Sequence, residues 1–272
     1  MLDYVLIKPE LHINIDHIAT IRQVRKTIEP STLEAVKIIE STKASGITMH
    51  LREDRRHIND QDIFEIDNYL RNSRLGLTFE MGATEEIRSI CLKTKAKLAT
   101  LVPEKREELT TEGGLDLISK QDYLREFIKP IKANGIEISF FIDPIHEQIH
   151  QAKEIGAEFI EIHTGTYANL FIKYHADIAA LGFSHPHVEA IKFEALTDPV
   201  KEEILRIKTA IEFAQGLGLK TNLGHGLTVP NLLPLLEHVK NVEELHIGHS
   251  IVANSIYYGL KEIISKFLVV IK

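Results

Sequence analysis

The chain has 272 residues, enough for two ordinary domains or for one large (β/α) barrel. Its hydrophobic content of 44% and charged content of 26% are normal for a soluble globular protein. The formal net charge of −7 argues against a general nucleic-acid binder, which needs a basic face to displace counterions. An anionic substrate would therefore need a site that is locally positive.

Disulfide-rich and membrane-spanning classes are also excluded. Cys91 is the single cysteine, so no intrachain disulfide can form, and its helical sequence context predicts a core residue rather than a nucleophile. No apolar run approaches the ~18 residues that span a bilayer. The stretch MLDYVLIKPELHINID contains acids and a proline and lacks the pattern of a signal peptide. We therefore expect a cytoplasmic protein without a membrane partner.

Short apolar runs alternate with helical patterns along the whole chain. Strands are expected over residues 11–15, 46–51, 75–80, 97–102, 136–142, 158–162, 218–223 and 244–247. Helices are expected over residues 31–43, 60–72, 120–133, 145–156, 166–181, 199–217 and 231–240, with another beginning at Thr84 and a last one ending near Val269. Ser31 is the expected N-cap of the first helix, and a kink is expected at Pro130. The stretch HIATIRQVR is expected to carry Arg22 and Arg25 into a loop.

Eight strand–helix units imply parallel strands, and their closure predicts a single-domain (β/α)8 TIM barrel over residues 1–272. The alternative is an open doubly wound sheet, which would place a glycine-rich turn after the first strand, where this chain has NIDHIAT. Residues 183–198 interrupt the connection between strands six and seven, so we interpret them as an insertion. Its His185 and His187 are expected to be loop histidines rather than ligands.

Polar side chains stand at or just beyond nearly every expected strand end. They are Asn14, Asp16, His17, His50, Arg52, Glu80, Glu104, Lys105, Asp143, Glu161, His163, Asn222, His225, Gly248 and His249, counting the glycine that opens the last turn. Because barrel active sites lie at the C-terminal strand ends, this set predicts a catalytic rim. The stretch GITMHLREDRRHIN is its most prominent part, although a solvated basic loop remains an alternative there.

Three features suggest the chemistry. His50, Glu80 and His225 can exchange protons near neutral pH, especially if burial raises the glutamate pKa, which suits a reaction with several proton transfers. The strings GHGLT and IGHS are typical of the barrel phosphate cradle, although ordinary turns can contain the same residues. The string LTTEGGLD, with Thr110, is a weaker candidate for a second phosphate site or a closing lid.

A metal centre is not expected. Barrel metallohydrolases often carry His-x-His at the end of the first strand, whereas this chain has His12-x-Asn14 and adjacent Asp16 and His17, which diverge. No second cysteine is available as a ligand, and neither a serine nucleophile elbow nor a P-loop is present.

The strings NIDHIATIR, GITMHLREDRRHI, FEMGATEE, LVPEKREELTTEGGLD, FIEIHTGTYA, LGLKTNLGHGLT and ELHIGHSIV occur in this order. Through them the chain resembles the pyridoxine 5′-phosphate synthase family from about Leu11 to Leu260. The resemblance implies a cytoplasmic homo-octamer of TIM barrels with extra helices. It implies condensation of 1-deoxy-D-xylulose 5-phosphate with 3-amino-2-oxopropyl phosphate to pyridoxine 5′-phosphate, phosphate and water, with no metal or organic cofactor.

The resemblance also implies residue roles. His50 and Glu80 match proton acceptors, His225 matches a proton donor, and Glu161 matches a transition-state stabiliser. The aminoketone phosphate is expected at Asn14, Arg25, Gly226, Gly248 and His249. The deoxyxylulose phosphate is expected at Asp16, His17, Arg52, His57 and Thr110. Gly82 departs from the family pattern, which suggests a small residue with a side chain, and predicts a looser strand end.

Three other functions remain open on the sequence alone. One is another phosphate-binding barrel enzyme that uses a single sugar phosphate, such as an isomerase. A second is a catalytically silent barrel that senses a phosphometabolite, which would be expected to have lost His50, Glu80 or His225. A third is a metal-dependent hydrolase, which would contain stoichiometric metal.

Overall fold

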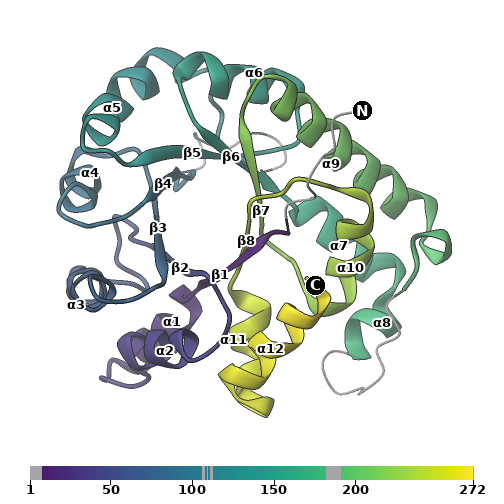
Figure 1. Cartoon of the computed structure of the whole chain (residues 1–272), viewed down its shortest axis with the longest axis horizontal. Coiled ribbons are helices and arrows are strands. Elements are labelled where there is room, and N and C mark those ends of the chain that lie inside the picture. Colours follow the sequence, from purple (N-terminus) through teal and green to yellow (C-terminus); the bar gives the residue numbers. More distant parts are fainter. Residues whose placement is uncertain (1–7, 106–107, 109, 111–112, 182–190, 272) are drawn as a thin grey trace.

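A closed barrel of parallel strands forms the centre of the molecule (Figure 1). The structure is a computed structural model that describes residues 8–105, 108, 110, 113–181 and 191–271. Within these ranges the strands are β1 Glu10–Asn14, β2 Gly46–His50, β3 Gly76–Met81, β4 Leu98–Leu101, β5 Glu137–Ile142, β6 Phe159–His163, β7 Lys220–Gly224 and β8 Glu244–Ile247. Each strand pairs with the next, and β1 closes the ring by pairing with β8, with His12 opposite His246. The predicted single-domain (β/α)8 barrel is confirmed.

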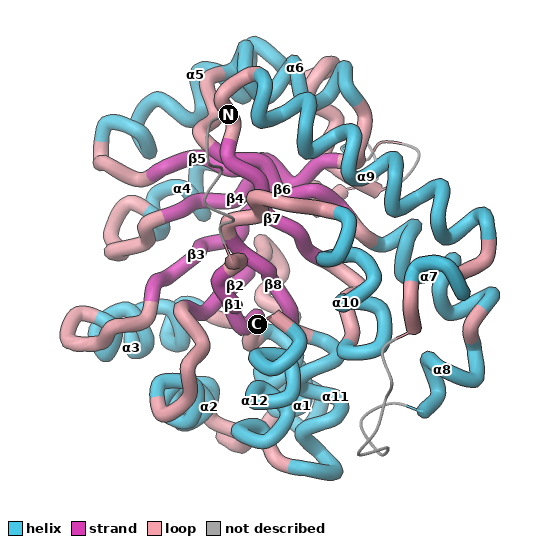
Figure 2. The backbone as a smooth tube through the Cα atoms, turned by 45° about the vertical axis from the view of Figure 1, so that its right-hand side comes forward, coloured by secondary structure: helices cyan, strands magenta, loops and turns pink. Residues whose placement is uncertain are grey.

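Helices surround the strands on the outside (Figure 2). They are α1 Asp16–Arg25, α2 Thr32–Glu40, α3 Asp60–Leu70, α4 Glu85–Cys91, α5 Gln121–Ala133, α6 His146–Ile155, α7 Gly165–Tyr174, α8 Ala176–Leu181, α9 Asp198–Gly216, α10 Val229–His238, α11 His249–Tyr258 and α12 Leu260–Val270. None of the helices in the described ranges combines the length and apolar character needed to cross a membrane.

Side-chain caps fix several helix starts. The Ser31 hydroxyl accepts from the Glu34 amide at the start of α2, as its sequence position predicts. Asn59 and Asp62 form a reciprocal capping box at α3. Pro130 lies inside α5, which runs from Gln121 to Ala133. Cys91 is fully buried in the core, as expected.

Three expected helical boundaries are wrong. Residues 16–25 form helix α1 rather than a loop, because Ala19 packs in the core and Arg22 makes a two-pronged ion pair with Asp62 at 2.6 Å on each arm. The last helix is two helices, α11 and α12, because Gly259 between them has a φ of 84°. The expected helix over 166–181 is likewise divided into α7 and α8 at His175.

The interrupting segment lies between α8 and α9. Residues 183–190, with His185 and His187, are outside the described residues, whereas residues 191–198 are described. Phe193 lies in a short 3-10 helix over Phe193–Ala195 and stacks on His238 of α10, with ring centroids 3.8 Å apart. The segment therefore separates the helices that follow β6 rather than extending the strand-end loop directly.

The inner face of the barrel is polar. Along β2, Ile47 and Met49 alternate with Thr48 and His50, as the period of a strand requires. Polar side chains also meet across the barrel, where the Thr78 hydroxyl lies 3.3 Å from His12 Nδ1. The buried apolar side chains pack between the strands and the helices. This arrangement places ionisable groups under the C-terminal strand ends.

Candidate active site

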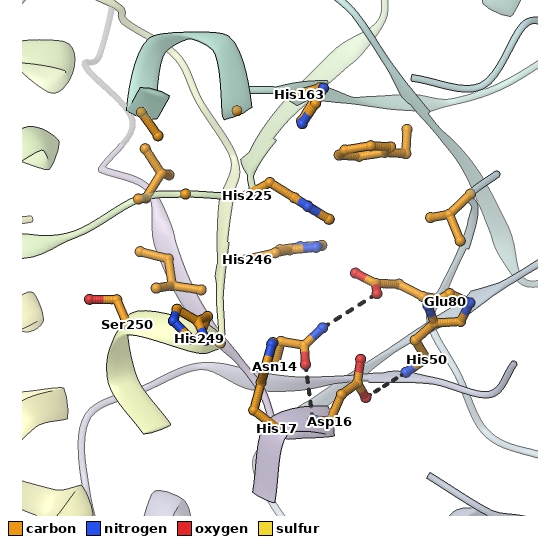
Figure 3. A pocket seen from close by; sticks show the side chains of 18 of the residues that line it. Asn14, Asp16, His17, His50, Glu80, His163, His225, His246, His249 and Ser250 are labelled. Carbon is orange, nitrogen blue, oxygen red and sulfur yellow. Dashed lines mark hydrogen bonds between the residues drawn. The ribbon is translucent and has the colours of Figure 1, made fainter. Parts of the chain in front are cut away.

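A cavity of about 620 Å³ opens at the C-terminal ends of the strands (Figure 3). It is lined by most of the expected site residues, namely Asn14, Asp16, His17, His50, Arg52, His57, Glu80, Glu161, His225, Gly226, Gly248 and His249. These residues come from β1, β2, β3, β6, β7 and β8 and the turns that follow them. The expected convergence of separate strand ends on one hollow is therefore present.

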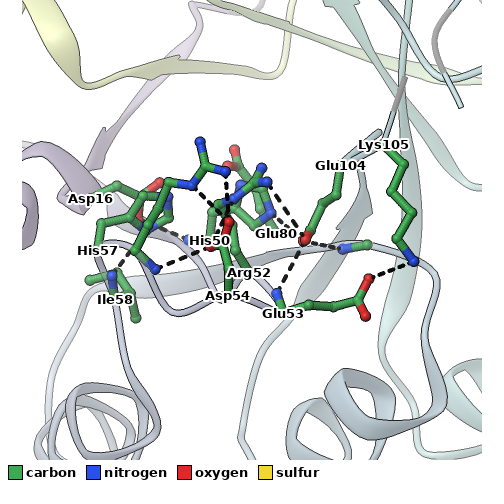
Figure 4. A network of polar contacts seen from close by, with 12 residues as sticks. Asp16, His50, Arg52, Glu53, Asp54, His57, Ile58, Glu80, Glu104 and Lys105 are labelled. Atoms are coloured by element: carbon green, nitrogen blue, oxygen red, sulfur yellow. Dashed lines mark hydrogen bonds and ion pairs between the residues drawn. The ribbon is translucent and has the colours of Figure 1, made fainter. Parts of the chain in front are cut away.

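His50 is held from two sides at the end of β2 (Figure 4). Its backbone amide donates to Asp16 Oδ1 at 2.9 Å, and its Nε2 lies 2.9 Å from Glu104 Oε1. Glu104 also accepts from the amides of Gly82 at 3.0 Å and Glu53 at 3.1 Å. The strand end at Gly82 is therefore tied to Glu104 rather than loose, and the imidazole of His50 is oriented by a carboxylate.

Asp16 and Glu80 are buried acids on the cavity wall. Burial raises the pKa of Asp16 to about 6, although the neighbouring His50 opposes this shift. Burial, followed by the charges of Glu161 and Asp16, raises the pKa of Glu80 well above its usual range. Asn14 Nδ2 donates to Glu80 Oε2 at 3.4 Å. The surroundings of Glu80 thus favour its protonated form, in the direction that the sequence suggested.

His225 follows β7 in an unusual backbone conformation. Its φ of 73° lies in the left-handed region, and the Thr164 hydroxyl holds its carbonyl oxygen at 2.5 Å. The ring lies 4.5 Å from that of Phe141, centroid to centroid, and is open to the cavity. Desolvation by the surrounding protein lowers the pKa of His225 to about 4, and the charge of Glu161 opposes this shift without reversing it. The imidazole is therefore neutral at neutral pH.

Two glycines, Gly226 and Gly248, line the cavity near His225. Gly226 has a φ of 74°, and a Cβ there would approach the Ala168 side chain to 2.4 Å. Gly248 precedes the first turn of α11, where unpaired backbone N–H groups and the helix dipole favour an anion. His17 and His249 meet edge to face, with centroids 5.1 Å apart.

A second basic region lies after β2. The Arg52 guanidinium contacts Asp54 at 3.3 Å and comes within 4.0 Å of Glu104. Burial lowers the pKa of His57 to about 4, with smaller contributions from the charges of His50 and Arg52. His57 Nδ1 accepts from the Ile58 amide at 2.9 Å, so a neutral His57 can offer its Nε2–H to a ligand.

Two expected residues do not line this cavity. Arg25 is exposed at the C-terminal end of α1. The Thr110 hydroxyl donates to the buried carboxylate of Asp143, which also accepts from the Gly114 amide at 3.0 Å. Asp143 in turn lies 3.1 Å from His163 Nδ1. Thr110 therefore fastens the loop after β4 beside the cavity instead of facing into it.

His246 is a cavity-lining residue that the sequence interpretation missed. It is the second-last residue of β8, but the sequence interpretation took Gly248 and His249 as the end of this strand and so passed over it. The alternation of side chains along a strand could have revealed it. Glu244 and His246 share one face of β8, as His12 and Asn14 share one face of β1. Asn222, which the sequence placed on the rim, points instead to Glu244, whose amide donates to its Oδ1 at 3.1 Å.

Three groups of described residues bring possible metal ligands within 4.8 Å of one another. They are His12 with Glu244 and His246, Asp16 with His50 and His57, and Glu80 with Glu161 and His246. Several of these side chains already have protein partners, since His50 Nε2 meets Glu104, His57 Nδ1 accepts from the Ile58 amide and His246 Nε2 meets Glu244. His246 faces a carboxylate at both ring nitrogens, and a nitrogen that carries hydrogen offers no lone pair to a metal. We assign none of the three as a metal site.

The fold and the site define a (β/α)8-barrel protein with a cavity lined by ionisable side chains and glycine-containing turns at the C-terminal strand ends. A family model described as pyridoxal phosphate biosynthesis protein PdxJ matches residues 11–272. The chain belongs to this family.

Similar proteins agree with this assignment. A pyridoxine 5′-phosphate synthase of Sulfurihydrogenibium sp. (strain YO3AOP1) is 45% identical over 256 residues, which cover 94% of this chain and 95% of that protein. A pyridoxine 5′-phosphate synthase of Aquifex aeolicus (strain VF5) is 45% identical over 263 residues, covering 96% and 99%. A solved mutant tryptophan synthase α-subunit from Pyrococcus furiosus shares the fold, with a TM-score of 0.59 at 11% identity over 97% of this chain and 98% of that one.

Proposed function

We propose that this chain condenses 1-deoxy-D-xylulose 5-phosphate with 3-amino-2-oxopropyl phosphate to give pyridoxine 5′-phosphate, phosphate and water. The relatives' name supports an enzyme of pyridoxine biosynthesis. The observation that carries the proposal is the convergence of His50, Glu80 and His225 on one cavity. This reaction joins two carbon skeletons through several proton transfers without oxidation or reduction, which suits imidazoles and a buried carboxyl group.

In the proposed mechanism the amine attacks the deoxyxylulose carbonyl, and His50, Glu80 and His225 move protons through the imine, enamine and ring-closing steps. The family resemblance assigns Glu80 as an acceptor and His225 as a donor. In the free site the raised pKa of Glu80 favours its protonated form, and the lowered pKa of His225 favours its neutral form. Glu80 must therefore release its proton, and His225 must gain one, before each takes its expected role. Glu161 faces the cavity as the candidate stabiliser of positive charge on nitrogen.

Two places suit the two phosphate groups. The amides around Gly226 and Gly248 suit the aminoketone phosphate, and Asn14 and His249 lie beside them. Arg52 and His57, with Asp16 and His17 at their edge, suit the deoxyxylulose phosphate. Arg52 brings a positive charge to the second place, and backbone N–H groups can hold a phosphate at the first without a net positive charge, so phosphorylated substrates are compatible with the net charge of −7.

We further propose a homo-octamer in the cytoplasm. Val24 and Ile28 near the end of α1 are 77% and 86% exposed, and Ile256 and Tyr257 of α11 are 69% and 79% exposed. Large apolar side chains on adjoining helices are what a subunit interface would cover. Arg25 lies among them, so its expected phosphate contact would be made in the cavity of a neighbouring subunit.

Incubation of the purified protein with both phosphorylated substrates tests the reaction. We expect a pyridine chromophore and release of inorganic phosphate, neither of which forms when the aminoketone is omitted. Turnover of one sugar phosphate alone would favour an isomerase-like barrel enzyme instead. We expect the activity to survive treatment with a chelator and to need no organic cofactor. Stoichiometric bound metal with loss of turnover on its removal would favour the hydrolase.

A further inference from the structure

A line of buried ionisable side chains continues from the cavity floor into the barrel. His246 is central to it and only 4% exposed. Its Nε2 lies 2.9 Å from Glu244 Oε2, and its Nδ1 lies 2.8 Å from Glu161 Oε2. A carboxylate oxygen this close to each ring nitrogen favours the imidazolium cation, in which both nitrogens carry hydrogen; the contact at Nε2 is a hydrogen bond, whereas Nδ1 has no hydrogen-bond partner among the described atoms.

The pKa of His246 agrees with this geometry. Burial lowers it, but the charges and contacts of Glu161 and Glu244 outweigh burial and raise it well above its usual range. The ring also stacks on His12, with centroids 5.5 Å apart. His246 is therefore a buried positive charge directly beneath the site.

Glu161 has buried oxygen atoms that are not hydrogen-bonded. Its side chain is 1% exposed, and the 2.8 Å approach to His246 lacks the angle of a hydrogen bond, so neither carboxylate oxygen has a hydrogen-bond partner among the described atoms. An unsatisfied buried acceptor costs about 1–3 kcal/mol, so it calls for an explanation. Because Glu161 lines the cavity, a substrate N–H or a cationic nitrogen can supply the missing partner.

We propose that His246 is a positioning residue: fixed by Glu244 at one nitrogen, it holds the Glu161 carboxylate in place and keeps it negative at the cavity floor. This inference rests on the proposed condensation, in which positive charge develops on the substrate nitrogen. A carboxylate preorganised against that charge contributes most in the transition state. The neighbouring Glu80 stays neutral partly because Glu161 is already charged.

Titratable groups from four strands lie around His246, and Glu161 and Glu244 act most on its charge. They are Glu161 from β6, Glu244 from β8, Glu80 from β3 and His12 from β1, while β7 contributes the uncharged Asn222. The carboxylates of Glu161 and Glu244 both contact the ring and favour its protonated form. Replacing the ring by a neutral group therefore removes the positive charge that lies between these two carboxylates.

The test compares His246→Gln with wild type. The amide is polar but uncharged, so Glu161 loses its counter-ion, which favours the protonated carboxyl. We expect kcat at neutral pH to fall about 10²-fold, the scale of a lost electrostatic contact in a transition state, with KM changed far less. We also expect kcat to recover as pH rises, because Glu161 regains its charge. A merely structural role would lower kcat by the same factor at every pH.

Two further variants keep the inference falsifiable if His246→Gln does not fold. Glu244→Gln retains size and an acceptor for His246 Nε2 but removes the charge, so it should shift the pH profile in the same direction by a smaller amount. Glu10→Gln is the matched control, because this 62% exposed side chain lies 4.0 Å from His12 at the outer end of the same line. It should leave the profile unchanged.

The outcomes separate the two proposals. A wild-type protein that forms no pyridine product overturns the condensation itself. If the wild type is active and kcat of both Glu244→Gln and His246→Gln depends on pH as it does in the wild type, only the positioning role is overturned. Stoichiometric metal in the wild type that disappears in His246→Gln would likewise overturn it, because His246 would then be a ligand.

Discussion

Gly224, the last residue of β7, leaves the space that the Glu161 side chain occupies. A Cβ on Gly224 would lie 1.8 Å from Glu161 Oε1, whereas ordinary contact begins at 3.4 Å. In Gly224→Ala the carboxylate must therefore move by about 1.6 Å, the difference between these distances. A displacement of about 1 Å in a catalytic group can cost about 10²-fold in rate. We expect kcat to fall about 10²-fold or more, measured as pyridine product formed from both phosphorylated substrates.

The fold should tolerate this change, because the clash falls on the end of a flexible side chain. Overpacking of a core typically costs about 1–3 kcal/mol, which urea denaturation measures directly. Gly216→Ala is the matched control, since a Cβ at that last residue of α9 meets no other atom within 4 Å. It should keep full turnover and gain up to about 1 kcal/mol of stability. Near-normal kcat in a folded Gly224→Ala protein would refute the importance of the Glu161 position.

Three further predictions concern other parts of the molecule. His50→Ala should lower turnover about 10²-fold or more while the melting temperature stays close to wild type, because it removes an acid–base group; near-normal turnover would remove His50 from the mechanism. The wild-type kcat/KM should decline as pH falls through about 6, because Asp16 then takes up a proton and becomes a weaker acceptor for the amide of His50, which it helps to position; a flat profile across pH 6 would contradict this role. Asp62→Ala should cost about 3 kcal/mol in unfolding free energy, because Arg22 loses its partner in a largely buried ion pair. A loss below about 1 kcal/mol in urea titrations would show that water replaces the pair.

The barrel could be predicted because each strand is a short apolar run with a helix pattern after it. Strand boundaries agree within two residues, as at β5, expected over 136–142 and found at Glu137–Ile142. Helix α1 was missed because the residue before it, Ile15, cannot cap a helix with its side chain, and because few positions of the helix are buried. Its stability comes from the distant Asp62, which no local pattern reveals.

The site was predictable wherever its residues stand at strand ends. His50 and Glu80 are last or nearly last in their strands, so topology alone brings them to the same face. His246 is also second-last in its strand, but it was missed because Gly248 and His249 were taken as the end of β8; the alternation of β8 shows that it faces inward. The protonation of Glu80 and His225 depends on burial and neighbouring charges, which a sequence does not provide.

The polar interior of this barrel changes how its two ends relate. In most barrels the N-terminal face can be redesigned for robustness without touching the chemistry, because branched apolar layers insulate one end from the other. Here the stack of His12 on His246 links the lower rim to the floor of the cavity. Substitutions that disturb His12 at the N-terminal end of the barrel can therefore affect the active site. Such variants should be tested for turnover as well as for thermal stability.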